Sequence, residues 1–340
     1  METCIESCIN SIEIANSAVH ERMEVISLIS SQDPGVKYLT LDQALSHGRI
    51  QITEVSKEGS VPNLRVANRG KIPVLLLDGE EVAGAKQNRV LNTTILVPGE
   101  SEIEIPVSCT EQGRWSYSSP YFSDSEVMMN YRTRSKKMSS VSSSMRERHA
   151  SRISDQGGIW SDIHEMCCMS GVSSPTGAMK DVYESHNRKM EEYLAAFPPV
   201  QLQQGVLIYL DGLPAGFEFL SRPEAYARIH DKLIRSYVLE ALIDEKPPQP
   251  PGEPERPQEF LQRIASSHSE SYPGLGLGTE CRLEDPGVVG SALHHEDVVI
   301  HMVCFAGQQG YAPGVNRAGF RQRRNAHASR HDPRNDPWIL

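Results

Sequence analysis

The segment from residue 73 to residue 115 constrains the fold of this 340-residue chain more than any other stretch. It contains three short β-branched and aliphatic runs, Val74–Leu77, Val90–Val97 and Ile103–Val107. Runs of this length and composition, bounded by Gly and Pro, predict buried β-strands. Asp78-Gly79 is a dipeptide that tight hairpin turns favour, because glycine adopts positive φ at no steric cost. We therefore predict an antiparallel meander.

Two polar clusters interrupt this meander at its turns and strand ends. Their sequences are GEEVAGAKQNR and TEQGRW. A purely structural sheet does not need so many planar and charged groups in one place, so the two clusters form a candidate site. The residues concerned are Glu80, Glu81, Lys86, Gln87, Asn88, Arg89, Glu111, Gln112, Arg114 and Trp115.

The charge and hydropathy of the chain argue against some classes of function. A net charge of −10 at pH 7 argues against a general nucleic-acid-binding protein, which needs a basic surface. No run approaches the ~18 apolar residues of a membrane-spanning helix, so we expect no membrane insertion. Basic residues concentrate in residues 132–152 and 307–340. Only in the second of these segments do we expect any contact with nucleic acid.

The seven cysteines indicate a reducing compartment. Their number is odd, two of them are adjacent (Cys167 and Cys168), and the chain has no CxxC pair. This pattern suits neither a disulfide framework nor a zinc site. The N-terminus lacks a basic region followed by an apolar one, so we expect no secretory signal. We therefore expect a cytoplasmic protein with free thiols and no metal site.

We predict a single α+β domain over residues 1–306. Antiparallel strand units dominate the first third and helices alternate with hairpins afterwards, an order that favours α+β over a doubly wound parallel sheet. Three or four helices are expected to pack on the sheet. A mobile basic, Ser-rich loop at about 117–152 and a Pro-rich connection at about 246–257 leave the domain. Residues 307–340 are predicted to form a basic, disordered tail.

Two further segments could hold an anion. A helix is expected from Ser174 to about Phe197, because a serine N-cap followed by Pro175 is a strong start signal. Its free N–H groups, with the Ser174 and Thr176 hydroxyls, could bind a phosphate, although capping alone also explains these residues. The cations of the loop at 117–152 could close over an anion with bidentate contacts, although solvated charge explains them equally well.

Local signals predict three more units towards the C-terminus. Residues 205–220 read as strand–turn–strand around Asp211-Gly212. A helix follows the capping box that begins at Ser221. The last unit is a hairpin made of Val288–Leu293 and Val298–Phe305.

Four segments of the chain resemble one known family. They read LLLDGEEVAGAKQNRVLN, IPVSCTEQGRW, SSPTGAMKDVYE and GLGTECRLE…GSALHHEDVVIHMVCFA. They are similar to the prokaryotic family of ARG and rhodanese-phosphatase-superfamily-associated protein domains, over roughly Ile12–Phe305. The GAKQNR and SCTEQGRW motifs are the specific ones. The tail after Ala306 falls outside the family's pattern.

The resemblance implies a role in the metabolism of NAD-derived nucleotides. The family is named for gene neighbourhoods with ADP-ribosylglycohydrolase-type enzymes, so a nucleotide ligand such as ADP-ribose and ADP-ribose-processing partner enzymes are expected. No cofactor is identified. The family's motifs carry over onto both polar clusters and onto Ser174, Thr176 and Gly177.

On this hypothesis the polar clusters bind or process an ADP-ribose-like nucleotide. Glu81 or Glu111 would be the general acid or base in N-glycosidic cleavage. A carboxylate beside Lys86 or Arg89 would stay ionised and would therefore suit base work. The remaining roles are diphosphate binding by Lys86, Arg89 and Arg114, adenine stacking by Trp115, and recognition of ribose hydroxyls by Gln87, Asn88 and Gln112.

Two alternatives use the same residues without catalysis. In the first, the clusters form the recognition pocket of a sensor for the same class of nucleotide. In the second, pairs such as Glu81–Lys86 and Glu111–Arg114 only tie loops together, as surface ion pairs often do with little energetic effect.

Overall fold

The computed structural model divides by its contacts into two units, Met1–Ala306 and Gly307–Leu340. The described residues hold 8 helices and 17 strands, and nearly all strand pairs are antiparallel. The predicted α+β class is therefore confirmed, with more helices than the three or four expected. The tail beyond residue 307 and most of the Pro-rich connection lie outside the described residues, which are 3–56, 59–148, 151–243 and 255–307.

The largest sheet has eight strands, all paired antiparallel. It contains both hairpins predicted towards the C-terminus, one around Asp211-Gly212 and one before Ala306. In spatial order its strands are β1 (Ile12–His20), β2 (Met23–Ser30), β12 (Gly205–Leu210), β13 (Leu213–Leu220), β17 (Val298–Ala306), β16 (Val288–His295), β15 (Thr279–Asp285) and β14 (His268–Pro273).

Two smaller sheets contain most of the N-terminal half. The six-stranded sheet has the order β11 (Phe122–Met128), β7 (Glu80–Gly84), β8 (Arg89–Leu91), β10 (Ser101–Cys109), β5 (Asn63–Asn68) and β4 (Ile50–Glu54). The three-stranded sheet has the order β3 (Leu39–Thr40), β6 (Val74–Leu76) and β9 (Ile95–Val97).

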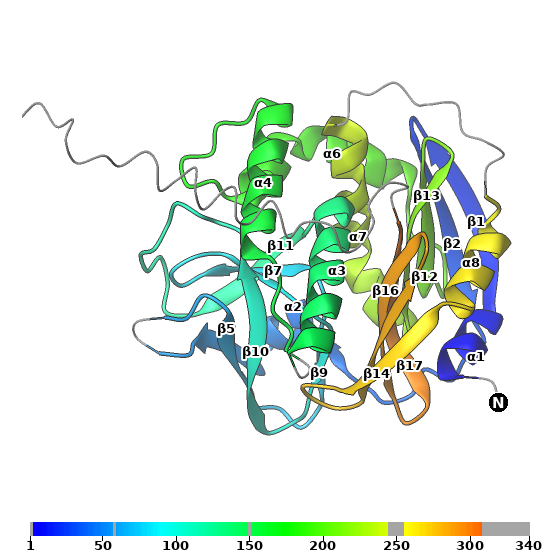
Figure 1. Cartoon of the computed structure of the whole chain (residues 1–340), viewed down its shortest axis with the longest axis horizontal. Helices are drawn as coiled ribbons and strands as arrows, with labels where there is room; N and C mark the ends of the chain where they lie inside the picture. Colours follow the sequence, from blue (N-terminus) through cyan, green and yellow to red (C-terminus); the bar gives the residue numbers. More distant parts are fainter. Residues whose placement is uncertain (1–2, 57–58, 149–150, 244–254, 308–340) are drawn as a thin grey trace, which may run out of the picture. The chain divides into compact units, whose positions relative to one another are not determined.

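Helices cover both faces of the eight-stranded sheet (Figure 1). Successive strand residues point to opposite faces, so Val206 and Ile208 pack with one helical layer and Leu207 with the other. None of the described helices combines the length and apolar character that crossing a membrane requires. The helices are α1 (Cys4–Asn10), α2 (Leu41–Ser46), α3 (Tyr131–Glu147), α4 (Gln156–Ser170), α5 (Met179–Ser185), α6 (Asn187–Ala196), α7 (Pro223–Ile243) and α8 (Pro257–Ala265).

The central meander is divided between two sheets, which corrects the prediction of one continuous unit. β6 and β9 pair with each other in the three-stranded sheet, whereas β7, β8 and β10 belong to the six-stranded sheet. Asp78-Gly79 is therefore the point at which the chain passes from one sheet to the other. Gly79 has φ of +84°, as a turn glycine should, but Asp78 is fully buried.

The prediction of a mobile loop over residues 117–152 is wrong for most of that segment. β11 and the 17-residue helix α3 occupy it. Met138, Val141 and Met145 form a buried stripe along one side of this serine-rich helix. Basic side chains of the same helix are buried as well, and their partners lie far away in the sequence.

Arg134 of α3 connects the two larger sheets through a buried ion cluster. Its Nε donates to Asp78 Oδ1 at 2.9 Å, and its Nη1 donates to Glu218 Oε1 of β13 at 2.5 Å. Lys137 Nζ donates to Asp78 Oδ2 at 2.7 Å and to the Leu91 carbonyl at 3.0 Å. Burial opposes the charge on Asp78, but Lys137 and Arg134 outweigh it and lower the pKa of this carboxyl. α3 is thus fixed by charge as well as by apolar packing.

Replacing Arg134 with methionine should cost about 3–5 kcal/mol of unfolding free energy, because it leaves buried carboxylates without their partner. Urea denaturation measures the loss. Arg188→Met is the matched control, since the Arg188 side chain is 94% exposed, and it should change stability by less than about 0.5 kcal/mol. Equal unfolding midpoints for the two variants would contradict this role for Arg134.

Candidate functional site

The structure brings the two polar clusters together at one edge of the six-stranded sheet. Gln87 Nε2 donates to the Glu111 carbonyl at 2.9 Å, and the Asn88 backbone N–H donates to Glu111 Oε2 at 3.1 Å. Arg114 Nη1 reaches back to the Ala85 carbonyl at 2.8 Å. Ala85 has φ of +41°, an uncommon conformation for a residue with a Cβ, at the turn that presents Lys86.

Glu111 and Arg114 bind each other, and the remaining hydrogen-bonding positions of the Glu111 carboxylate are filled by protein groups. Arg114 binds the carboxylate in a bidentate manner, with Nε–Oε1 at 2.9 Å and Nη2–Oε2 at 2.6 Å. Thr176 Oγ1 donates to Glu111 Oε1 at 3.0 Å. Burial raises the pKa of Glu111, but these hydrogen bonds together lower it, so the carboxylate stays ionised. Both partners hold the two loops to each other, as the structural alternative expects of this pair.

Arg89 is buried with part of its guanidinium unpaired. Its Nη1 donates to Gln87 Oε1 at 2.8 Å, whereas Nε and Nη2 have no hydrogen-bond partner among the described residues. The Cys109 thiol is an electrostatic neighbour, but no hydrogen bond of good geometry forms. Burial lowers the pKa of Arg89, and neither Cys109 nor Glu54 fully opposes this. A buried guanidinium with free N–H groups is costly unless something binds it.

Glu54, at the end of β4, faces the same place and was not among the predicted site residues. Its Oε2 has no hydrogen-bond partner among the described residues, and its side chain is buried. A Cβ added at Gly59 would lie 3.1 Å from Lys86, 3.4 Å from Trp115 and 3.5 Å from Glu54 Oε2, so these groups are neighbours. The sequence offered no signal for Glu54 beyond the alternation of apolar and polar residues from Ile50 to Glu54.

Aromatic side chains cover Arg89 from the solvent side. The Trp115 ring centroid lies 5.7 Å from Arg89 Cζ and 5.1 Å from Lys86 Nζ, and Trp115 is 48% exposed. Lys86 Nζ is also 5.1 Å from the Tyr117 ring. We call the group formed by Glu54, Lys86, Gln87, Arg89 and Trp115 the Arg89 corner.

Glu81 is not part of the Arg89 corner: the charged groups that act on its carboxyl are Lys180 and Glu111, which corrects its expected place beside Lys86 or Arg89. It is fully buried on β7, and Thr110 Oγ1 donates to its Oε1 at 2.5 Å. Burial raises the pKa of Glu81 from 4.5 to about 7. The carboxyl is therefore only partly ionised near neutrality, unlike the fully ionised base expected beside Lys86 or Arg89.

Ser174 does not begin a helix, which corrects that prediction. Gly177, at φ of +62°, interrupts the helical path, and α5 starts only at Met179. The segment pairs instead with the end of the second polar cluster, where the Gly113 N–H donates to the Thr176 carbonyl at 2.7 Å. The Ser174 hydroxyl donates to Asp181 at 2.5 Å and accepts from the Ala178 N–H at 2.8 Å. Ser174 and Thr176 thus stabilise a loop.

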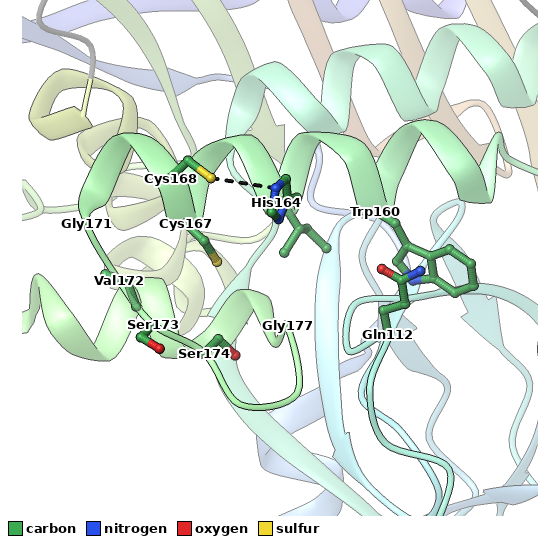
Figure 2. A pocket seen from close by; sticks show the side chains of 11 residues that line it. Gln112, Trp160, His164, Cys167, Cys168, Gly171, Val172, Ser173, Ser174 and Gly177 are labelled. Atoms are coloured by element: carbon green, nitrogen blue, oxygen red, sulfur yellow. Dashed lines mark hydrogen bonds between the residues drawn. The ribbon is translucent and has the colours of Figure 1, made fainter. Parts of the chain in front are cut away.

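A cavity of about 430 Å³ opens between α4 and this loop (Figure 2). Of the predicted residues it includes only Gln112 and Ser174. Trp160, His164, Cys167 and Cys168 were not predicted, although the i, i+4 spacing of His164 and Cys168 was a signal for these two. The lining residues are Gln112, Trp160, Ile163, His164, Cys167, Cys168, Gly171, Val172, Ser173, Ser174 and Gly177.

A family model, that of the ARG and Rhodanese-Phosphatase-superfamily-associated Protein domain, matches residues 11–305. The chain belongs to this family. The resemblance noted in the sequence over roughly Ile12–Phe305 is thereby confirmed. No curated protein and no solved structure matches the chain.

The four motifs of this ARG and rhodanese-phosphatase-associated domain occupy distinct places in the fold. GAKQNR forms the turn between β7 and β8, and EQGRW follows β10. SSPTGAMKDVYE is the loop and helix that close over EQGRW through Thr176. The C-terminal motif contains Glu280 and Arg282, which bind each other and Thr93 inside the protein. Three of the four motifs therefore meet around Glu111.

Glu81 should make the protein less stable as pH rises from about 4.5 to about 7. In that window the folded state holds a proton that the unfolded state has lost, so stability falls by about 1.4 kcal/mol per pH unit. The total is about 3 kcal/mol and is complete above the folded pKa of about 7. Glu81→Gln should remove this slope, as measured by urea unfolding at pH 5 and pH 8. The exposed control Glu165→Gln should keep the slope. A slope that persists in Glu81→Gln would refute the assignment of this pH dependence to Glu81.

Proposed function

We propose that this protein binds ADP-ribose or a closely related NAD-derived nucleotide at the Arg89 corner. The observation that carries the proposal is the pair of unpaired buried groups there, Arg89 Nε and Nη2 on one side and Glu54 Oε2 on the other. Guanidinium N–H groups match the oxygens of a phosphate. A carboxylate oxygen that lacks a donor matches ribose hydroxyls, as it does in dinucleotide-binding folds. A nucleotide carries both groups in one molecule.

Trp115 supplies the third element that a nucleotide needs. Its ring is about half exposed and offers a face on which adenine can stack. Trp115 and Lys86 must swing aside for a phosphate to reach Arg89. Cation–π contacts are worth about 0.5–1 kcal/mol at exposed sites and about 2 kcal/mol when desolvated, as Lys86 and Arg89 are, so a phosphate must engage both free N–H groups of Arg89 to outweigh them.

The geometry favours binding over catalysis. Glu111 is engaged by Arg114, Thr176 and Asn88, so it has no free oxygen for proton transfer. Glu81 is fully buried beneath Thr110. Arg114 is saturated as well and does not serve as a diphosphate ligand in our proposal. A sensor or carrier of the nucleotide therefore fits better than a hydrolase.

The cellular setting is part of the same proposal. The family's name associates it with ARG and the rhodanese-phosphatase superfamily, which supports ADP-ribose-processing enzymes as functional partners. All seven cysteines are free, which is typical of proteins in a reducing compartment and supports a cytoplasmic location.

Calorimetric titration of the full chain with ADP-ribose, adenosine and inorganic pyrophosphate tests the proposal. Arg89→Met should weaken ADP-ribose and pyrophosphate about tenfold or more and leave adenosine unchanged, because a charge-assisted hydrogen bond contributes about 1.5–3 kcal/mol. Glu54→Gln should weaken ADP-ribose and adenosine but not pyrophosphate.

Stability without ligand provides the folding control for these variants. Arg89→Met loses one hydrogen bond to Gln87 but removes a buried charge with two unpaired N–H groups, so its melting temperature should stay close to that of the natural protein. Arg188→Met should leave both binding and stability unchanged. The proposal fails if ADP-ribose does not bind the natural protein at millimolar concentration, or if Arg89→Met binds it as well as the natural protein does. Release of adenine from adenosine or ADP-ribose, or of AMP from ADP-ribose, during the titration would instead favour an enzyme.

A further inference from the structure

The cavity beside α4 contains a cysteine and a histidine in direct contact. Cys168 Sγ lies 3.7 Å from His164 Nε2, within the range of a sulfur hydrogen bond. The two residues are one helical turn apart, so the helix itself holds them on the same side (Figure 2). Both are exposed and both line the cavity.

The neighbouring cysteine, Cys167, also lines the cavity but has a different environment. Cys167 is buried and its side chain leaves another side of the helix, away from His164 (Figure 2). Burial raises the pKa of its thiol, and Asp181 and Cys168 add to the effect. Because a thiolate rather than a thiol is the nucleophile, Cys167 is the less reactive of two adjacent residues.

We propose that Cys168 is a nucleophilic thiol that adds to small α,β-unsaturated carbonyl compounds in this cavity, with His164 as its base. His164 Nε2 takes the thiol proton as the sulfur forms a bond to the β-carbon of the electrophile. The C=C π-electrons move to the α-carbon, which receives the proton back from the imidazolium. No oxidant, reductant or other co-reactant enters, and the product is a stable thioether.

The cavity has the size for such a compound. Its volume of about 430 Å³ falls within the range of small-molecule sites, and the loop from Gly171 to Gly177 forms its opposite wall. The site is independent of the Arg89 corner, because none of the five residues of that corner lines this cavity.

Two other uses of the same residues fit less well. No group of three His, Cys, Asp or Glu side chains in the described part of the chain is placed to hold a metal ion. A disulfide between Cys167 and Cys168 is excluded while α4 is helical, because adjacent Cα atoms lie about 3.8 Å apart, closer than disulfide geometry accepts.

Limiting N-ethylmaleimide, an α,β-unsaturated carbonyl probe, tests the proposal on the full chain. Peptide mass spectrometry at short times should show Cys168 labelled at least tenfold faster than Cys167 and Cys4. Cys4 is a suitable internal reference, since burial raises its pKa to about 11. Cys168→Ser should remove the fast phase without exposing a new one.

His164→Gln separates activation from mere exposure. It should slow the labelling of Cys168 about tenfold or more, in keeping with the size of general-base effects, while Glu165→Gln leaves the rate unchanged. Both positions are exposed, so neither change threatens the fold. Labelling of Cys168 at an equal rate in the two variants, or a rate no greater than that of Cys167, would overturn the proposal. Nucleotide binding at the Arg89 corner is not part of this readout.

Discussion

The interaction between Arg134 and its two carboxylates determines how the sheets of this protein are joined. Asp78 lies where the chain passes from the three-stranded to the six-stranded sheet, and Glu218 lies on a strand of the eight-stranded sheet. One guanidinium therefore connects strands that belong to different layers. A buried ion pair contributes little net stability over an apolar replacement, but it is costly to break and tolerates few alternative partners. It selects one arrangement of the layers.

Two other buried ion clusters also connect separate elements of the fold. Lys232 of α7 binds Glu80 and Asp124, which lie on the neighbouring strands β7 and β11. Arg282 and Arg152 bind Glu280, and Arg282 also binds Thr93 in the loop before β9. In the first two clusters a cation of a helix lies between carboxylates of two other elements, whereas in the third Arg152 and Arg282 share the single carboxylate of Glu280. The Arg89 corner differs from all three, because there the opposite charges, Arg89 and Glu54, lie close without satisfying each other.

Local sequence signals were sufficient where the structure depends on neighbours in the chain. The turn at Asp211-Gly212 and the capping box at Ser221 predicted β12, β13 and α7 because each needs only a few adjacent residues. They failed where the deciding partner is remote. Arg134 is 84 residues from Glu218, so nothing near the serine-rich stretch indicated that its cations would be buried.

The candidate site was likewise predictable where its residues are close in the chain and not where a partner is remote. The two polar clusters could be placed together because they flank paired strands of one meander, and β8 does pair with β10. The separation of Glu81 from Lys86 could not be foreseen, because a residue's face depends on the strand register. Glu54 was missed because it enters the corner from β4, two strands away from β10 in the sheet. Family membership identified the motifs but did not show which of their side chains already have hydrogen-bond partners within the protein.

The burial of Arg134 and Lys137 has a practical consequence for anyone who alters this chain. A basic, serine-rich stretch usually invites an inserted tag, a protease site or a shortened linker. In this protein such a change would shift the helical phase and move both cations out of reach of Asp78. Residues 131–147 are therefore among the least permissive places for insertion, despite a composition typical of the most permissive.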